Sequence, residues 1–138
     1  MKPFDITIEE DRVRMAVSGK TLEELFRNSL RGLVSYWSGD APPSRSEHVE
    51  EPVKVDAVDL GSLLVEFLSE VIARADMNDI RYIDFRPDTL GENFLEGTLL
   101  GVPAEHPERP IRAVSYEHVD VTKNPETGLY ETELVFEL

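Results

Sequence analysis

The chain changes character at Gly19-Lys20-Thr21-Leu22-Glu23-Glu24-Leu25-Phe26-Arg27-Asn28, where a pattern typical of strands gives way to one typical of a helix. Thr21 is placed to cap the helix through its hydroxyl, and Glu24 follows three residues later, as in a capping box. Apolar residues then recur at steps of three and four, which puts them on one helical face. They are Leu22, Leu25, Phe26, Leu30, Leu33, Val34 and Trp37. We expect this helix to begin at Leu22 and to end within residues 38–44.

Two short alternating segments precede the helix. Residues 4–9 and residues 13–17 alternate apolar and polar side chains with the period of two that strands have. Glu10 and Asp11 separate the two segments. The pattern fits two short strands, and it equally fits one strand with a bulge at the break.

A second helix is predicted after a further strand. Residues 53–57 alternate as a strand, and the polar stretch 47–52 before them is expected to be a loop. Asp59 is placed to cap the helix that follows. The apolar face of that helix consists of Leu60, Leu63, Leu64, Phe67, Leu68, Val71 and Ile72.

The remainder of the chain predicts strands joined by turns. Residues 80–86 and 94–100 are strand-like, and residues 87–91 have the length of a hairpin connection. Residues 101–110 contain three prolines, which favours an irregular loop.

The last segments complete a predicted fold class. Residues 111–121 and 129–138 flank a turn-forming sequence at 124–128 and predict a long terminal hairpin. Helices set among hairpin-linked strands are typical of α+β proteins. We therefore predict an α+β fold in which two helices pack on a mostly antiparallel or mixed β-sheet, within a single domain that spans residues 1–138.

Charge is the strongest global signal. The 138 residues include 28 acidic and 14 basic side chains, which give a formal net charge of −14. A protein with this charge repels phosphate backbones, so sequence-independent nucleic-acid binding is not expected. We expect its partners to be basic proteins, cations or neutral surfaces.

Composition also excludes several kinds of site. The chain has no cysteine, which rules out disulfides, zinc-thiolate sites and cysteine nucleophiles. No apolar run approaches the roughly 20 residues of a membrane span, and the first residues lack the apolar segment of a signal peptide. We therefore expect a cytoplasmic protein that does not bind membranes.

Catalytic motifs are not apparent. The histidines, His48, His106 and His118, lie in no recognisable catalytic arrangement. No strand is followed by a glycine-rich phosphate loop. We therefore expect a protein that is not an enzyme.

The end of the chain is a candidate site for a cation. Glu137 and the terminal carboxylate of Leu138 close a strand that is otherwise apolar. If Asp5 or Asp11 lay beside them, three negative groups would repel one another unless a cation or a basic partner neutralised them. The alternative is that Glu137 faces solvent at a frayed terminus.

Four segments, in the same order, resemble the archease family. They are the helix start at 19–28, the double-leucine helix at 59–70, the strand Ile111-Arg112-Ala113-Val114-Ser115-Tyr116, and the ending Val135-Phe136-Glu137-Leu138. The resemblance covers most of the chain and implies an α+β sandwich that assists the tRNA-splicing RNA ligase. It implies a non-enzymatic cofactor that promotes guanylylation of this ligase.

The resemblance also implies a metal site, usually one for calcium, made by an N-terminal Asp and the acidic C-terminal end. The matching metal ligands here would be Asp11 or Asp5, with Glu137 and Leu138. The family's His-Thr-Ala-Asp motif is not intact, because an ungapped comparison places Glu9-Glu10-Asp11-Arg12 there. A basic residue at position 12 could neutralise Glu137 in place of a metal. The sequence therefore leaves a second hypothesis, a chaperone-like or structural interaction module that kept the scaffold without activating a ligase.

Overall fold

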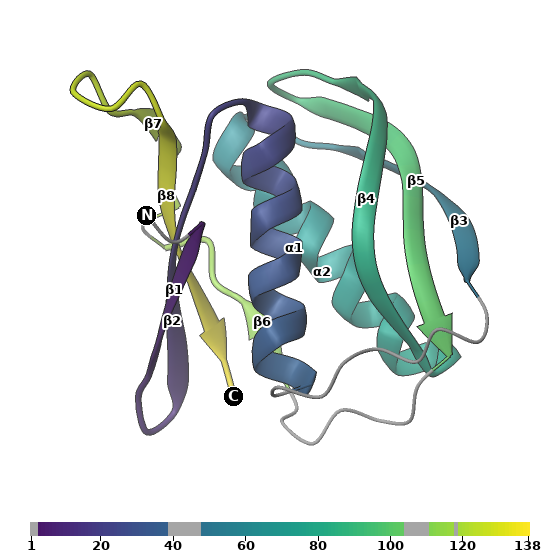
Figure 1. The fold of residues 1–138 in the computed structure, drawn as a ribbon. Coiled ribbons are helices and arrows are strands. Elements are labelled where there is room, and N and C mark those ends of the chain that lie inside the picture. Colours follow the sequence, from purple (N-terminus) through teal and green to yellow (C-terminus); the bar gives the residue numbers. More distant parts are fainter. Residues whose placement is uncertain (1–2, 39–47, 104–110, 118) are drawn as a thin grey trace.

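Two antiparallel sheets enclose a pair of helices in the described part of the chain (Figure 1). The structure is a computed structural model, and it describes residues 3–38, 48–103, 111–117 and 119–138. Helix α1 (Leu22–Ser38) contacts strands of both sheets, and helix α2 (Leu60–Asn78) lies beside it. The helices therefore form a middle layer with a sheet on either side.

The first sheet joins the two ends of the chain. Strands β1 (Phe4–Ile8), β2 (Arg12–Gly19), β8 (Tyr130–Glu137) and β6 (Ala113–Val114) lie in that order, and β7 (Thr122–Lys123) also pairs with β8. Each of these strand pairs is antiparallel. β1 and β2 form a hairpin, so the predicted pattern of two short strands is confirmed and the single bulged strand is not.

The second sheet contains strands from the middle of the chain. Its order is β3 (Val49–Asp56), β5 (Phe94–Pro103) and β4 (Ile80–Leu90), again antiparallel. The register of β4 against β5 shifts between Tyr82 and Asp84 and again between Pro87 and Thr89.

Both helices begin where their caps predict. The amide of Glu24 donates a hydrogen bond of 3.1 Å to the hydroxyl of Thr21. The amide of Ser62 donates one of 2.8 Å to Asp59, which has extended backbone angles. These side chains satisfy amides that a helix leaves unpaired in its first turn.

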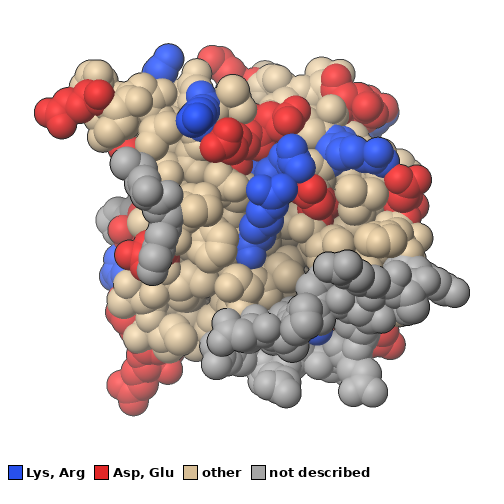
Figure 2. Space-filling view, in the orientation of Figure 1, with Lys and Arg blue, Asp and Glu red and all other residues tan. Residues whose placement is uncertain are grey.

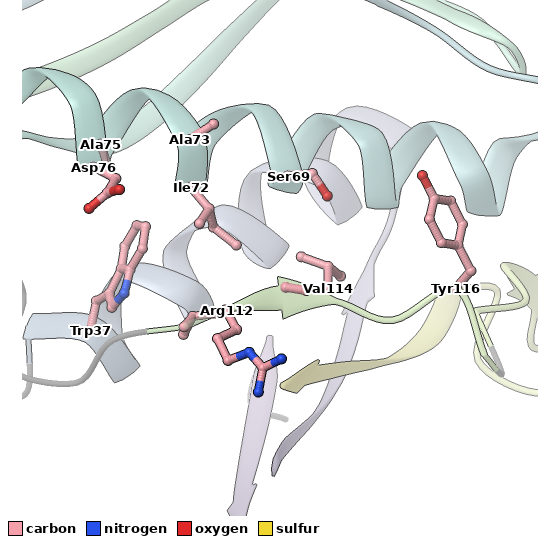
Figure 3. Close-up of a pocket in the computed structure, with 11 residues that line it drawn as sticks. Trp37, Ser69, Ile72, Ala73, Ala75, Asp76, Arg112, Val114 and Tyr116 are labelled. Carbon is pink, nitrogen blue, oxygen red and sulfur yellow. The ribbon is translucent and has the colours of Figure 1, made fainter. Parts of the chain in front are cut away.

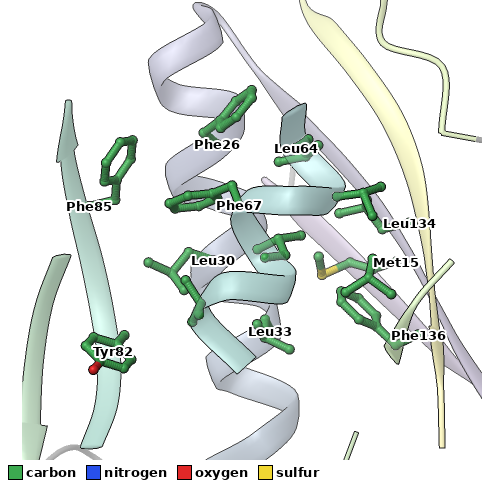
Figure 4. Close-up of a cluster of buried hydrophobic side chains, with 14 of the residues drawn as sticks. Met15, Phe26, Leu30, Leu33, Leu64, Phe67, Tyr82, Phe85, Leu134 and Phe136 are labelled. Atoms are coloured by element: carbon green, nitrogen blue, oxygen red, sulfur yellow. The ribbon is translucent and has the colours of Figure 1, made fainter. Parts of the chain in front are cut away.

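One apolar core fills the space between the sheets (Figure 4). Phe67 of α2 lies at its centre, with its ring 5.8 Å from that of Phe26 on α1 and 4.7 Å from that of Phe85 on β4. Met15 of β2 and Phe136 of β8 close the core from the first sheet. The helices therefore hold the two sheets together, and the α+β class predicted from sequence is confirmed. The strands divide into two sheets where the sequence analysis assumed one.

Three predicted loops are wrong in part, because strands extend into them. β3 starts at Val49, inside the predicted loop 47–52, and β4 continues through the predicted connection 87–91 as far as Leu90. Pro52 and Pro87 lie on β3 and β4, which are edge strands, where a missing amide donor is tolerated. β5 likewise extends to Pro103, inside the predicted loop 101–110. Residues 104–110, with His106, lie outside the described residues.

The predicted long terminal hairpin is also wrong. Among the described residues of 111–121, strand pairing with β8 is limited to the two residues of β6. The chain then approaches α2 so closely that a Cβ added to Gly61 would lie 2.4 Å from the carbonyl oxygen of Val119. The apolar residues of this segment therefore pack against the helix layer instead of extending the sheet. His118 lies outside the described residues.

Within the described ranges, no helix combines the length and apolar character that crossing a membrane would require.

Candidate functional site

Pairing between β2 and β8 brings the turn between β1 and β2 next to the C-terminal end of β8. Arg12, the first residue of β2, is opposite Glu137, the last residue of β8. Figure 1 shows the C-terminus at the end of the first sheet where β1 turns into β2. A pocket of about 410 Å³ opens here, which we call the terminal pocket. It is lined by Asp11, Arg12, Arg112, Ser115, Glu117, Val135, Glu137 and Leu138.

Backbone hydrogen bonds fix the walls of the terminal pocket. The amide of Leu138 donates to the carbonyl of Asp11 at 3.1 Å, so the last residue is tied to the β1–β2 turn. The amide of Arg112 donates to the carbonyl of Glu137 at 2.8 Å. The last two residues are therefore hydrogen-bonded and not frayed, whereas the side chain of Glu137 faces solvent as the alternative expected.

The pocket carries more negative than positive groups. Asp11, Glu117 and Glu137 contribute three negative side chains, against the two guanidinium groups of Arg12 and Arg112. The Nε of Arg12 lies 3.5 Å from Oδ1 of Asp11, in an ion pair whose Asp side chain is 78% exposed. Among the described residues, Arg112 has no ion pair. The excess of carboxylates suits a basic group brought by a partner.

The structure brings together three of the four residues predicted to bind a metal. Asp11, Glu137 and Leu138 line the terminal pocket. Asp5 lies elsewhere, because it is opposite Ala16, which is itself opposite Glu133. Glu133 is four residues before Glu137 on β8, a separation of about 13 Å along the strand. Of the two N-terminal candidates, Asp11 is therefore the one in the pocket.

The donors of the terminal pocket do not fit calcium as they are arranged. Calcium takes six to eight oxygen ligands. Within the part of the chain that the structure describes, no three acidic or histidine side chains are grouped closely enough to hold a metal ion. Arg12 also lies within ion-pair distance of Asp11. Within the described residues, the pocket therefore holds one ion pair, between Arg12 and Asp11, and further carboxylates without an ion pair.

The residues that β6 and its continuation contribute to the pocket were not predictable as site residues from the sequence. Arg112, Ser115 and Glu117 line the pocket because the short β6 pairs with the end of β8. The amide of Ser115 donates to the carbonyl of Val135 at 2.8 Å, and the amide of Glu117 donates to the hydroxyl of Ser115 at 3.0 Å. The family resemblance at residues 111–116 indicated a strand there. It did not indicate which strand β6 would pair with.

A second charged cluster lies over α1 and β4. Figure 2 shows Lys and Arg side chains among Asp and Glu on this face. Asp84 of β4 accepts hydrogen bonds from Nε and Nη2 of Arg27 at 3.0 and 2.8 Å, and Arg31 lies 3.5 Å away. Because these charges satisfy one another, we assign the cluster a structural role.

Comparisons with a family model and with known protein sequences all give matches to the same family. The model of the Archease protein family matches residues 12–138. Protein archease of Methanosarcina barkeri is 29% identical over 125 residues, covering 80% of each chain. Protein archease of Methanosarcina mazei is 24% identical over 134 residues, covering 91% of this chain and 89% of its own.

Solved structures show the same fold. The solution structure of protein 1598 from Methanobacterium thermoautotrophicum has a TM-score of 0.73 at 17% identity, and each chain is covered completely. The crystal structure of an archease from Thermotoga maritima, described as a possible chaperone, has a TM-score of 0.64 at 16% identity. That match covers 91% of this chain and 89% of the other.

Proposed function

Because the chain belongs to the archease family, we propose that it is a non-enzymatic protein cofactor that activates a tRNA-splicing RNA ligase by promoting guanylylation of the ligase. The terminal pocket is the contact site in this proposal. The observation that carries it is the gathering of Asp11, Glu137 and the Leu138 carboxylate at one place on the surface. A cytoplasmic location, as expected from the sequence, would suit this role.

Charge supports a protein partner over direct contact with RNA. The chain has a net charge of −14, which repels RNA but attracts an RNA-binding enzyme with a basic surface. Carboxylates at a hydrogen-bonded strand end can accept hydrogen bonds from a lysine or arginine of the ligase. In this proposal, the cofactor positions basic groups of the ligase near its nucleotide site and itself makes no covalent bond.

The decisive experiment measures pre-steady-state guanylylation of a purified cognate RNA ligase, with and without this protein. We expect acceleration with the native chain and a loss of at least about tenfold with Glu137→Gln or Asp11→Asn, because removing a charged hydrogen-bonding partner costs about 1.5–3 kcal/mol. Asp5→Asn is the matched control, since it removes the same charge about 13 Å along the sheet and should leave acceleration intact. Equal effects of Asp5→Asn and Asp11→Asn would contradict the site.

A chaperone-like interaction module is the second candidate function. The ion pair between Arg12 and Asp11 favours it, because Arg12 already occupies a carboxylate that a basic group of the ligase would otherwise bind. This function predicts no acceleration of guanylylation. It predicts instead that the chain suppresses light scattering by a heat-denatured test protein, and that Glu137→Gln does not change this suppression.

The effect of calcium on the melting temperature tests whether the terminal pocket binds a metal. A ligand that binds only the folded state must raise the melting temperature. Because Arg12 competes for Asp11 and the carboxylates are spread apart, we expect about 5 mM calcium to raise it by less than about 1 °C. Arg12→Asp should increase the calcium response. A large response of the native chain would instead favour a metal site formed by Asp11, Glu137 and Leu138.

A further inference from the structure

A second cavity, of about 530 Å³, lies between α2 and β6 (Figure 3). We call it the α2–β6 cavity. Its walls include Ile72 of α2 and, from the other side, Ile111 and Val114. Trp37 of α1 stands at one end and Tyr116 at the other. The cavity is thus an elongated, largely apolar trough with an aromatic ring at each end.

Trp37 presents an unused hydrogen-bond donor at this cavity. Its side chain is 5% exposed, and its indole nitrogen has no hydrogen-bond partner among the described residues. A buried N–H without an acceptor is costly, and native structures rarely keep one unless a ligand or water supplies the acceptor. An occupant of the cavity should therefore bring an acceptor such as a carbonyl oxygen.

Asp76 gives the same end of the cavity a negative charge. Figure 3 shows its carboxylate beside the indole of Trp37. In the described part of the chain, no ion pair involves Asp76. An aromatic ring next to an unpaired carboxylate suits a guanidinium or ammonium group, which both of them attract. The other charged residue of the wall, Arg112, directs its guanidinium away from α2 in Figure 3.

The far end of the cavity is already closed by a hydrogen bond. The hydroxyl of Tyr116 donates to the carboxylate of Glu66 on α2. This bond ties the segment after β6 to the helix and so fixes the width of the trough at that end. At the other end, Asp76 is exposed and is the group that a basic side chain of an occupant would meet.

From these features, we infer that the α2–β6 cavity docks an extended segment of a protein partner in which an arginine or lysine lies next to an apolar side chain. The apolar side chain packs between Ile72 and Val114. The basic group meets Asp76, and a backbone carbonyl accepts from the Trp37 indole. The net charge of −14 favours such a basic segment over an acidic one.

The position of the cavity supports a protein partner as the source of the docked segment. Arg112 lines both the α2–β6 cavity and the terminal pocket. A protein seated at the terminal pocket could therefore also reach the cavity, so the two sites would form one continuous surface. This last point rests on the proposed function, whereas binding of the segment itself does not.

Trp37 makes the inference directly measurable, because it is the only tryptophan in the chain. The probe is a six-residue peptide, acetylated and amidated, with arginine at its second and fifth positions, valine and leucine between them, and glycine at both ends. We expect it to shift Trp37 emission to shorter wavelength, since water leaves the cavity. We also expect the single indole N–H signal in an NMR spectrum of the labelled protein to move downfield as it gains an acceptor.

Variants separate specific docking from general attraction. Asp76→Asn should weaken binding of this peptide about five- to tenfold, through loss of a charge-assisted contact. Asp88→Asn, which removes the same charge on the opposite sheet, should leave affinity unchanged. Ala73→Leu adds volume at an exposed helical position of the cavity wall and should abolish the response without lowering the melting temperature.

Several outcomes would overturn the inference. One is an equal response to a peptide with glutamate in place of both arginines, and another is no response at a saturating peptide concentration. An equal response to free arginine would reassign the cavity to a small molecule, and a shift that depends on protein concentration alone would reassign it to a second copy of the chain. Because none of these measurements uses a ligase, they are independent of the proposed function.

Discussion

Asp84 is a partly buried carboxylate surrounded by hydrogen-bond donors. Its side chain is 21% exposed and accepts two hydrogen bonds from Arg27 and one of 2.9 Å from the amide of Phe85. Burial alone would raise the pKa of Asp84. The hydrogen bonds from Arg27 and Phe85, together with the charges of Arg27 and Arg31, outweigh burial and hold the pKa below its ordinary value.

The lowered pKa of Asp84 predicts a pH-dependent contribution to stability. Asp84→Asn should reduce the free energy of unfolding at neutral pH by about 1–3 kcal/mol, because the guanidinium of Arg27 loses its charged partner. The unfolded pKa is near 3.9, and the folded pKa is lower. The stabilisation is therefore complete above about pH 5 and is lost as the pH falls through the folded value. Urea unfolding at neutral and acid pH measures this.

An exposed ion pair provides the control for Asp84. Arg86 and Glu50 form a hydrogen bond of 2.6 Å, but their side chains are 58% and 60% exposed. Glu50→Gln should therefore change stability by less than about 1 kcal/mol at either pH. If Glu50→Gln and Asp84→Asn had the same effect, partial burial would not be what distinguishes the two pairs.

At the scale of elements, the junction between β2 and α1 depends on a glycine. A Cβ added to Gly19 would lie 2.5 Å from the backbone nitrogen of Leu25, closer than such atoms can approach. Gly19→Ala should therefore lower the free energy of unfolding by about 1–3 kcal/mol, because the strand and helix must move apart. Gly91→Ala is the matched control, since its nearest atom would be 3.7 Å away. Thermal unfolding of both variants tests this, and a comparable loss in each would contradict the proposed close contact.

The helices were predictable from sequence, whereas several strand ends were not. Thr21 and Asp59 cap the helices through local hydrogen bonds, and each apolar face repeats every three or four residues. The extent of β3 and β4 depends on which partner each strand pairs with and on whether it lies at an edge. Polarity at 47–52 and hairpin length at 87–91 therefore predicted loops, whereas both strands continue there and tolerate Pro52 and Pro87 at the sheet edges.

At the scale of the whole molecule, the terminal pocket depends on the register of strands far apart in the chain. Sequence singled out Glu137 and Leu138 by their position, and left Asp5 and Asp11 as alternatives. The choice between these two depends on β2 pairing with β8 so that Arg12 is opposite Glu137. A period of two shows which face of a sheet a residue is on, but not which residue is opposite it. The presence of Arg112 and Glu117 in the terminal pocket was therefore not predictable.

The overall negative charge predicts how binding to a basic partner should respond to salt. Attraction between oppositely charged proteins acts before contact, so it raises the association rate and is screened by ions. The association rate with the cognate ligase should therefore fall by about tenfold or more between about 50 mM and about 500 mM sodium chloride. The dissociation rate should change much less, because contacts at the terminal pocket and the α2–β6 cavity are shorter than the screening length. Surface plasmon resonance at several salt concentrations separates the two rates. An association rate independent of salt would mean that the net charge of −14 serves only solubility and does not attract the partner.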